Sequence, residues 1–122
     1  MHMLPADVAP PEGASTGAAV ARTWLGRVPA HRSDAYLAYL QETGVRGLRA
    51  TPGNQGVMVL RRMVGDVAEF QVISTWDSLE SIRAFAGEPI DTARYYPADS
   101  DFLLGMSEKV EHWELFAEPP TV

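Results

Sequence analysis

The chain has 122 residues, 10 Lys and Arg against 16 Asp and Glu, a net charge of −6 and no cysteine. Disulfides and thiolate metal sites are therefore excluded, and basic residues scattered singly along an acidic chain provide no surface for nucleic acid. No apolar run approaches the roughly 20 residues of a membrane span, and residues 1–17 lack the basic and apolar regions of a secretory signal. We expect one domain, located in the cytoplasm, with neither nucleic acid nor membrane as a partner.

Both ends of the chain are expected to lie outside the folded domain. Residues 1–18 hold three prolines, two glycines and only two strong aliphatic residues, Leu4 and Val8. Such a segment cannot bury enough apolar surface to offset the entropy of ordering, so we predict a mobile tail. Residues 118–122, which contain two further prolines, predict a second tail and leave 19–117 as the domain.

The first two elements are expected to be a strand and a helix. Residues 20–28 are rich in β-branched and aromatic side chains and end at a proline, which is typical of a strand. Ser33 or Asp34 can then cap a helix that runs to about Val45. Residues 46–56 follow as a loop, in which the Pro-Gly pair at 52 and 53 suits a type II turn.

A β-hairpin is the sharpest local pattern. Two strand-like runs, residues 57–64 and 67–76, flank the dipeptide Gly65-Asp66, which favours a two-residue hairpin turn. Counting back from the turn gives three cross-strand pairs: Arg62 with Glu69, Leu60 with Gln71, and Met58 with Ile73. One face of the hairpin then carries Phe70, Val72 and Trp76, whereas the other carries Met58, Leu60 and Ile73.

The remaining elements complete a βαββαβ order. Asp77 and Glu80 form a variant capping box before a helix that Gly87 and Pro89 end. Residues 90–105 predict one or two short helical turns around Pro97, and residues 108–116 predict a last strand. This order favours an α+β, ferredoxin-like sandwich with a four-stranded antiparallel sheet.

The expected sheet also favours a homodimer. Both faces of the hairpin are largely apolar, but two helices can cover only one of them. Met58, Leu60 and Ile73 therefore need another cover, because large apolar patches are rarely left exposed. A second copy of the sheet supplies that cover with one self-complementary surface.

Three segments carry a resemblance to a known family: TWDSLESIRAFAG (75–87), ARYYPADSDFLL (93–104) and VEHWEL (110–115). They resemble the antibiotic biosynthesis monooxygenase family, and the similarity covers residues 20–116. The resemblance implies a ferredoxin-like fold in which two subunits form a dimeric α/β barrel. The resemblance leaves the activity open, because it extends to quinone-forming monooxygenases, haem-degrading enzymes and proteins of unknown role.

The haem-degrading branch of that family has an aromatic residue in the second helix and, further on, a histidine that binds iron. The resemblance places Phe85 and Tyr95 at these positions. Tyrosine can bind haem iron, but the missing histidine speaks against conventional haem degradation, and we predict no cofactor. The histidines do not cluster and no dinucleotide or phosphate-loop motif occurs, so we predict no metal or nucleotide site either.

The quinone-forming branch implies oxidation of a phenol or anthrone by O₂ without a cofactor. Because the substrate supplies the electrons, such a protein needs an aromatic pocket, a group that takes or polarises the phenolic proton, and exclusion of water. We therefore predict a cofactor-independent monooxygenase of a small aromatic, phenolic or polyketide-like molecule. The alternative is a non-catalytic small-ligand-binding or structural dimer of the same fold.

Candidate residues for this site come from the strands and from the connection before the last strand. His112, whose side chain titrates near neutrality, is the preferred base, and Tyr95 and Tyr96 can donate hydrogen bonds to a ligand. The expected substrate-binding residues are Trp76, Phe85, Phe70, Trp24 and Arg22. Each also has a structural interpretation: the aromatic residues suit the core, and Arg22 suits a buried ion pair with Glu111 or Glu114. Arg94 is expected to be a solvated helix charge.

Overall fold

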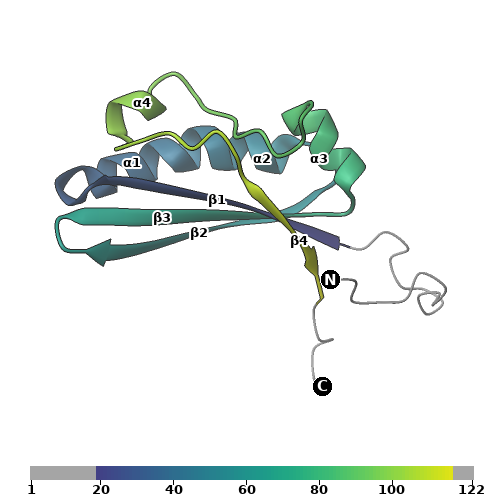
Figure 1. Cartoon of the computed structure of the whole chain (residues 1–122), viewed down its shortest axis with the longest axis horizontal. Helices are drawn as coiled ribbons and strands as arrows, with labels where there is room; N and C mark the ends of the chain where they lie inside the picture. Colours follow the sequence, from purple (N-terminus) through teal and green to yellow (C-terminus); the bar gives the residue numbers. More distant parts are fainter. Residues whose placement is uncertain (1–18, 117–122) are drawn as a thin grey trace.

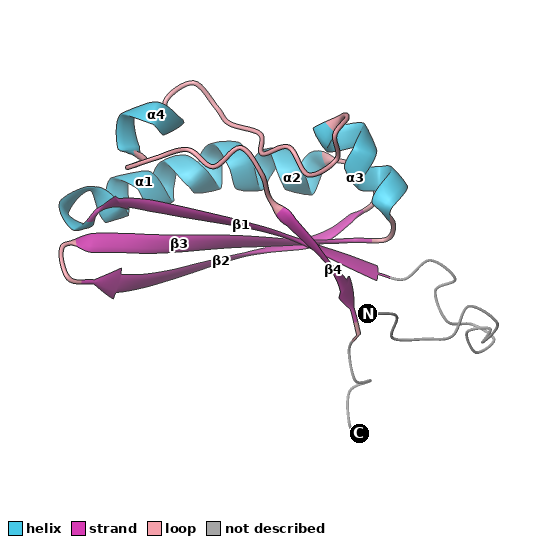
Figure 2. Cartoon of the chain, viewed as in Figure 1, coloured by secondary structure: helices cyan, strands magenta, loops and turns pink. Residues whose placement is uncertain are grey.

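The computed structural model describes residues 19–116, so the predicted tails, residues 1–18 and 118–122, lie outside the described residues. The path of the chain is traced in Figure 1, and helices and strands are distinguished in Figure 2. The elements are β1 (Ala19–Pro29), a 3₁₀ turn (Ala30–Arg32), α1 (Ser33–Leu40), a π-helical turn (Gln41–Val45), α2 (Arg46–Ala50), β2 (Asn54–Val64), β3 (Val67–Trp76), α3 (Leu79–Ala86), α4 (Asp99–Phe102) and β4 (Glu111–Leu115). α4 is the short helical turn expected near Pro97, and the βαββαβ order is confirmed.

The strands form one antiparallel sheet in the order β2-β3-β1-β4. β1 therefore lies inside the sheet, with β3 along one side and β4 along the other. The helices lie on one face of the sheet, and the opposite face carries no helix of residues 19–116 (Figure 1). This arrangement is the ferredoxin-like α+β sandwich that the sequence predicts.

The first helical segment is longer than predicted. We expected it to end near Val45 and a loop to follow, but the π-helical turn carries it into α2, which ends at Ala50. Leu48 is buried in the core cluster, and its burial outweighs the cost of about 1 kcal/mol for a glycine in a helix. The type II turn then forms as predicted: the Asn54 N–H donates to the Thr51 carbonyl at 3.1 Å, and Gly53 has a φ of 92°.

The β2–β3 hairpin has the predicted register. Val64 faces Val67 across the Gly65-Asp66 turn, and the pairs Arg62 with Glu69, Leu60 with Gln71 and Met58 with Ile73 are all present. Arg62 Nε lies 2.6 Å from Glu69 Oε1. Because side chains alternate along a strand, this register turns Phe70, Val72 and Trp76 toward the helices.

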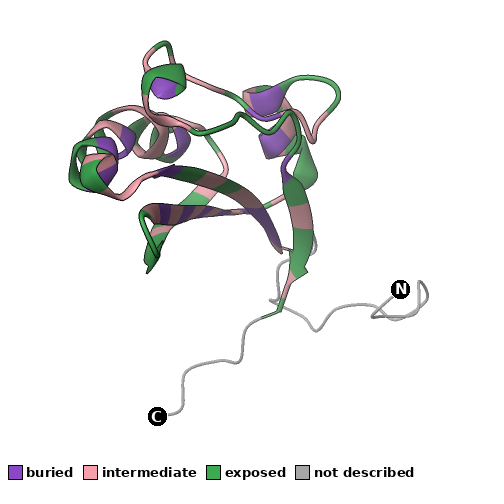
Figure 3. Ribbon diagram, turned by 60° about the vertical axis from the view of Figure 1, so that its left-hand side comes forward, coloured by how far each residue is buried: buried purple, intermediate pink, exposed green. Residues whose placement is uncertain are grey.

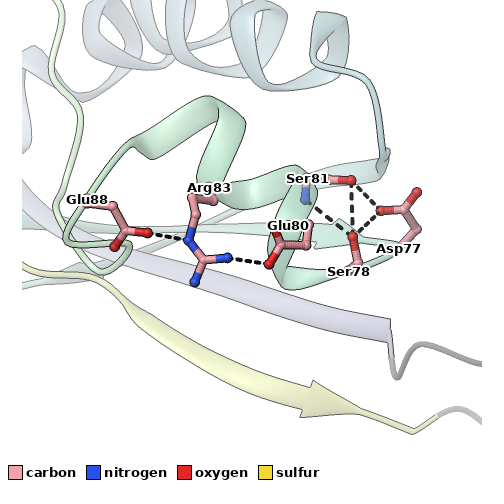
Figure 4. A network of polar contacts seen from close by, with 6 residues as sticks. All are labelled: Asp77, Ser78, Glu80, Ser81, Arg83 and Glu88. Atoms are coloured by element: carbon pink, nitrogen blue, oxygen red, sulfur yellow. Dashed lines mark hydrogen bonds and ion pairs between the residues drawn. The ribbon is translucent and has the colours of Figure 1, made fainter.

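The start of α3 differs from the prediction by one residue. Ser78, not Asp77, is the N-cap, and its Oγ accepts a hydrogen bond from the Ser81 N–H at 3.3 Å (Figure 4). The backbone of Asp77 continues the pairing beyond the end of β3, because its N–H donates to the Gly53 carbonyl at 3.0 Å. Its carboxylate instead accepts from the Ser81 hydroxyl at 2.6 Å. Gly87, with a φ of 76°, ends the helix as predicted.

The core lies between the sheet and the helices, where Figure 3 shows the buried residues. Trp76, Tyr36, Phe70, Ile82 and Val28 are its largest fully buried members. The Tyr36 ring meets the Phe70 ring edge to face, with centroids 5.2 Å apart, an arrangement that adds to the free energy of burial. Within residues 19–116 no helix is long and apolar enough to span a membrane.

The outward face of the sheet is apolar and exposed. Leu25 is 61% exposed, Met58 54% and Trp113 56%. These side chains come from β1, β2 and β4, so the exposed surface crosses the whole sheet. This face needs a cover that residues 19–116 of one chain do not provide.

Candidate functional site

A small cavity lies between the helix-facing side of the sheet and the segments that cover it. Its volume is about 70 Å³, which is room for a few water-sized groups. Its lining residues are Arg22, Trp24, Tyr36, Leu40, Thr43, Gly44, Leu48, Val72, Ser74, Phe85, Arg94, Tyr95, Tyr96, Asp99 and Val110. Of the predicted site residues, it brings together Arg22, Trp24, Phe85, Tyr95 and Tyr96.

Arg22 places a guanidinium beside this cavity from the middle of the sheet. On β1 it faces Ser74 of β3 and His112 of β4, and the residue is only 5% exposed. Its Nη1 donates to the Ile90 carbonyl at 2.8 Å and to His112 Nε2 at 2.9 Å, and its Nη2 donates to the Thr92 carbonyl at 2.7 Å. The predicted ion pair with Glu111 or Glu114 is wrong. The connection after α3 passes over Arg22 and supplies carbonyl oxygens in place of a carboxylate.

The charge of Arg22 is maintained in this buried position. Burial and then the like charge of Arg94 lower the pKa of Arg22 to about 10, whereas Asp91 acts in the opposite direction. The group therefore stays protonated at neutral pH. The Phe85 ring lies near both cations, with its centroid 5.6 Å from Arg22 Cζ and 5.7 Å from Arg94 Cζ, within the range of a cation–π contact.

His112 lies behind Arg22 and is not part of the cavity lining. A guanidinium N–H can only donate, so Nε2 of His112 accepts and the ring proton lies on Nδ1. Burial and then the charge of Arg22 hold the pKa of His112 below its usual value. The imidazole is therefore neutral at neutral pH, and its basic nitrogen is occupied by Arg22.

Trp24 and Tyr95 form one wall of the cavity. The Trp24 indole Nε1 donates to the Tyr95 hydroxyl at 3.0 Å, and that hydroxyl donates to the Ser107 carbonyl at 2.7 Å. The indole lies against Gly26, where an added Cβ would stand 2.2 Å from its ring. The glycine therefore sets the position of Trp24, and both bonds of Tyr95 are made within the chain.

Tyr96 and Asp99 form another part of the cavity lining. Asp99 is buried, and its two oxygens accept from the Tyr36 hydroxyl at 3.0 Å and from the Tyr96 N–H at 2.7 Å. Burial, followed by Asp99, raises the pKa of Tyr36, which keeps that phenol protonated as a donor. The Tyr96 hydroxyl itself lies against α2, 2.2 Å from where a Cβ on Gly47 would stand.

The predicted residues Trp76 and Phe70 lie beneath the cavity and do not line it. Trp76 is fully buried, donates from Nε1 to Ser74 Oγ at 2.9 Å, and packs its ring 6.0 Å from that of Phe85. Phe70 packs on Tyr36. Both therefore support wall residues from behind.

Several lining residues were not anticipated from the sequence. Arg94 lies in the connection before α4, not in a helix, and reaches the cavity. Its Nη1 donates to the Phe85 carbonyl at 2.8 Å. Asp99, the first residue of α4, was not among the predicted site residues, and Thr43 and Gly44 belong to the π-helical turn. A π-helical turn is a frequent feature of functional sites. It could not be predicted here, because the spacing of apolar residues along the sequence does not reveal its extra residue.

The lining does not fit haem. Tyr95, at the position where the haem-degrading branch has its iron ligand, uses its hydroxyl in the hydrogen bonds to Trp24 and Ser107, and no histidine lines the cavity. A cavity of about 70 Å³ is also far below the roughly 300 to 1,000 Å³ of sites for larger ligands. Across residues 19–116, His, Asp and Glu form no group that could hold a metal ion.

Comparison with solved structures shows the fold. A candidate antibiotic biosynthesis monooxygenase from Bacillus cereus aligns with a TM-score of 0.55 and 17% identity, over 87% of this chain and 99% of that chain. The haem-degrader MhuD from Mycobacterium tuberculosis, with two haems bound in its active site, aligns with a TM-score of 0.55 and 22% identity, over 84% and 99%. A protein of unknown function from Nitrosomonas europaea gives 0.55 and 18%, over 86% and 97%.

By sequence, no family model and no curated protein matches the chain. The structural alignments nevertheless cover nearly all of each neighbour. The chain therefore has the ferredoxin-like fold of these solved structures, which is the fold that the resemblance predicts.

Proposed function

We propose that this protein is a cofactor-independent monooxygenase that oxidises a small phenolic molecule with O₂. The observation that supports the proposal is the cavity, which joins aromatic walls to a buried cation on the covered face of the sheet. Concave, mostly apolar sites with a few polar groups are the usual small-molecule sites of proteins. A neighbour of the same fold is itself a candidate monooxygenase.

The proposed reaction takes all its electrons from the substrate. A phenol becomes a quinone when one atom of O₂ forms the new carbonyl group and the other leaves as water with the two hydrogen atoms that the phenol loses. Four electrons pass from the ring to O₂, so no external reductant is needed. The protein must stabilise the phenolate that reacts with O₂ and must limit the access of bulk water.

Two lining residues suit the phenolate. The Tyr96 hydroxyl makes no hydrogen bond within residues 19–116 and can donate one to the phenolate oxygen. Arg94, which is exposed, adds a positive charge that favours loss of the phenolic proton to water at the mouth. Tyr95 and Trp24 form the wall against which the ring lies.

The volume of the cavity limits the size of the substrates that can enter it. An apolar cavity of about 150 Å³ holds one benzene molecule, and the cavity here measures about 70 Å³. It can take a polar substituent and the edge of one ring, while the remainder of the molecule lies at the mouth. We therefore favour a single-ring phenol over an anthrone or a larger polyketide.

Two roles are proposed for His112, and two substitutions distinguish them. The sequence suggests a general base, whereas its hydrogen bond to Arg22 favours a positioning residue that fixes the guanidinium. A glutamine in its place keeps an acceptor for Arg22 but cannot take a proton at neutral pH. If His112 is a positioning residue, His112→Gln retains turnover and His112→Ala loses it; if it is the base, both variants lose turnover by about 10²- to 10⁴-fold.

The second function that the cavity supports is binding without chemistry. The basic nitrogen of His112, the predicted base, already accepts a hydrogen bond from Arg22, so it is not free to take a proton from a ligand. A protein that binds a small aromatic molecule and does not oxidise it would have the same walls. Binding without oxygen consumption would select this function.

We further propose a homodimer formed by the outward faces of two sheets, working in the cytoplasm. The exposed Leu25, Met58 and Trp113 support the dimer because they cross the whole sheet. A cysteine-free chain needs no oxidising compartment.

Oxygen consumption tests the proposed activity. Purified protein is mixed with hydroxybenzoates, uncharged phenols and hydroxyanthrones, without added metal or reductant. We expect substrate-dependent uptake of one O₂ per quinone formed, and a loss of about 2- to 10-fold in Tyr96→Phe, which removes one hydrogen bond. Arg49→Gln, an exposed arginine of α2 outside the cavity, serves as the matched control. Uptake no faster than in buffer, for every compound, would refute the activity.

A further inference from the structure

Arg22 is a buried cation without an anionic partner among residues 19–116. Its contacts there are two backbone carbonyls, the neutral His112 ring and the Phe85 face, and the ion pairs found in the described chain do not include it. Asp91, the carboxylate that acts on its pKa, pairs with Lys109 at 3.3 Å. Removing an arginine from water in this way is costly unless an opposite charge or full hydrogen bonding compensates.

The hydrogen bonding of Arg22 is incomplete. A guanidinium has five N–H groups, and three hydrogen bonds are made: two from Nη1 and one from Nη2. Within residues 19–116, one N–H on Nη2 and the N–H on Nε therefore have no acceptor. Nε and Nη2 are both bonded to Cζ, and an N–H of each, on the same side of the planar group, can bind a carboxylate with two parallel hydrogen bonds.

The lining of the cavity carries a net positive charge. It contains the cations Arg22 and Arg94 and one carboxylate, that of Asp99. Both oxygens of Asp99 already accept hydrogen bonds, from Tyr36 and from the Tyr96 backbone. The two arginines share the Phe85 ring, so an anion that enters here meets two positive charges.

From this arrangement we infer that the cavity recognises an aromatic carboxylate, whose carboxylate group binds the Nε and Nη2 side of Arg22. One edge of the ligand's ring then lies among Trp24, Phe85 and Tyr95, and the rest of the ring lies at the mouth of the cavity. A carboxylate offers two oxygens to two donors, and the largely apolar remainder of the lining suits an aromatic ring better than the further oxygens of a phosphate. This inference rests on the proposed function only in placing the substrate in this cavity, and it names that substrate as a phenol that also bears a carboxylate.

Binding of two ligands that differ only in charge tests the inference. Salicylate and its uncharged amide, salicylamide, are titrated into wild-type protein by calorimetry in oxygen-free buffer, so no turnover is required. We expect salicylate to bind about 10- to 100-fold more tightly, the range of a charge-assisted hydrogen-bond pair. Equal affinities, or binding of neither ligand, would overturn the inference.

Substitution of Arg22 tests whether this residue causes the preference for salicylate over salicylamide. We expect Arg22→Gln to bind both ligands equally, and Arg49→Gln, an exposed arginine of α2, to keep the wild-type preference. An Arg22→Gln variant that is folded and still prefers salicylate would overturn the inference. If Arg22→Gln does not fold, Arg22→Lys takes its place: it keeps the charge but lacks the planar pair of donors, and it should lose most of the preference.

The outcomes separate this inference from the proposed activity. Preferential binding of salicylate without oxygen consumption by any phenol supports the carboxylate site and refutes the oxygenase. Oxygen consumption with uncharged phenols at the rate of hydroxybenzoates supports the oxygenase and refutes the carboxylate site.

Discussion

At the scale of single residues, Arg22 and His112 form a pair whose state depends on pH. The neutral imidazole accepts from the guanidinium at 2.9 Å, and this bond is lost if the imidazole gains a proton. Both groups would then be cations in contact. A positioned Arg22 therefore requires a neutral His112.

The pair predicts a pH dependence of stability. The pKa of His112 is held below the usual 6.5, first by burial and then by Arg22, so the unfolded chain takes up the proton at a higher pH than the folded chain. The contribution of His112 to stability is full above 6.5 and falls as the pH decreases toward the lowered pKa. We expect the free energy of unfolding in urea to fall as the pH decreases below about 7 toward the lowered pKa of His112, and His112→Gln to show a smaller fall.

An exposed histidine provides the control for this measurement. His31, in the 3₁₀ turn after β1, is exposed, and His31→Gln should retain the wild-type fall. The pH dependence would contradict the assigned pair if His112→Gln and wild type were indistinguishable.

At the scale of elements, α2 sets the position of the Tyr96 hydroxyl through Gly47. An alanine there would place its Cβ 2.2 Å from the Tyr96 hydroxyl, and the phenol, as the end of a flexible side chain, would turn away. Alanine is also favoured over glycine in a helix by about 1 kcal/mol. We therefore expect Gly47→Ala to keep or raise the free energy of unfolding in urea and to weaken salicylate binding or phenol turnover.

A double substitution tests whether Gly47→Ala acts by moving the Tyr96 hydroxyl or by a general effect on α2. Tyr96→Phe combined with Gly47→Ala should be no worse for turnover than either change alone, because both remove the same hydroxyl from the cavity. Additive losses would show that Gly47 acts by another route.

The same elements show where sequence reasoning succeeds and where it stops. The hairpin register follows from one turn and strict alternation, so Arg62 and Glu69 could be paired from the sequence alone. Tyr95, Tyr96, Trp24 and Phe85 could be assigned to one cavity because the fold order was right. The path of the connection between α3 and β4 could not be predicted, because no periodic pattern in the sequence determines it. This connection contains Arg94, Asp99 and the two carbonyl groups that accept from Arg22.

At the scale of the whole molecule, one face of the sheet holds the cavity and the other is an exposed apolar surface. We expect a dimer that buries well over about 1,000 Å² through this second face. Leu60→Asp places a charge there, on a side chain that is 47% exposed in the single chain, so it should give a folded monomer by light scattering.

The matched control for the dimer is on the other side of the molecule. Leu79 is equally exposed, at the first position of α3, and Leu79→Asp should remain dimeric. A wild-type protein that is monomeric at micromolar concentration would refute the proposed dimer.

The cavity as the ligand site is the central claim, and the three tryptophans allow one direct measurement of it. Trp24 lines the cavity, Trp76 is buried beneath it, and Trp113 lies on the outward face. Salicylate is titrated into isotope-labelled protein, and the three indole N–H resonances are followed by NMR after assignment with single Trp→Phe variants. We predict that the Trp24 resonance, whose N–H donates to Tyr95, shifts most and in a saturable way, while that of Trp113 stays in place. A saturable shift at Trp113 with none at Trp24 would contradict the claim.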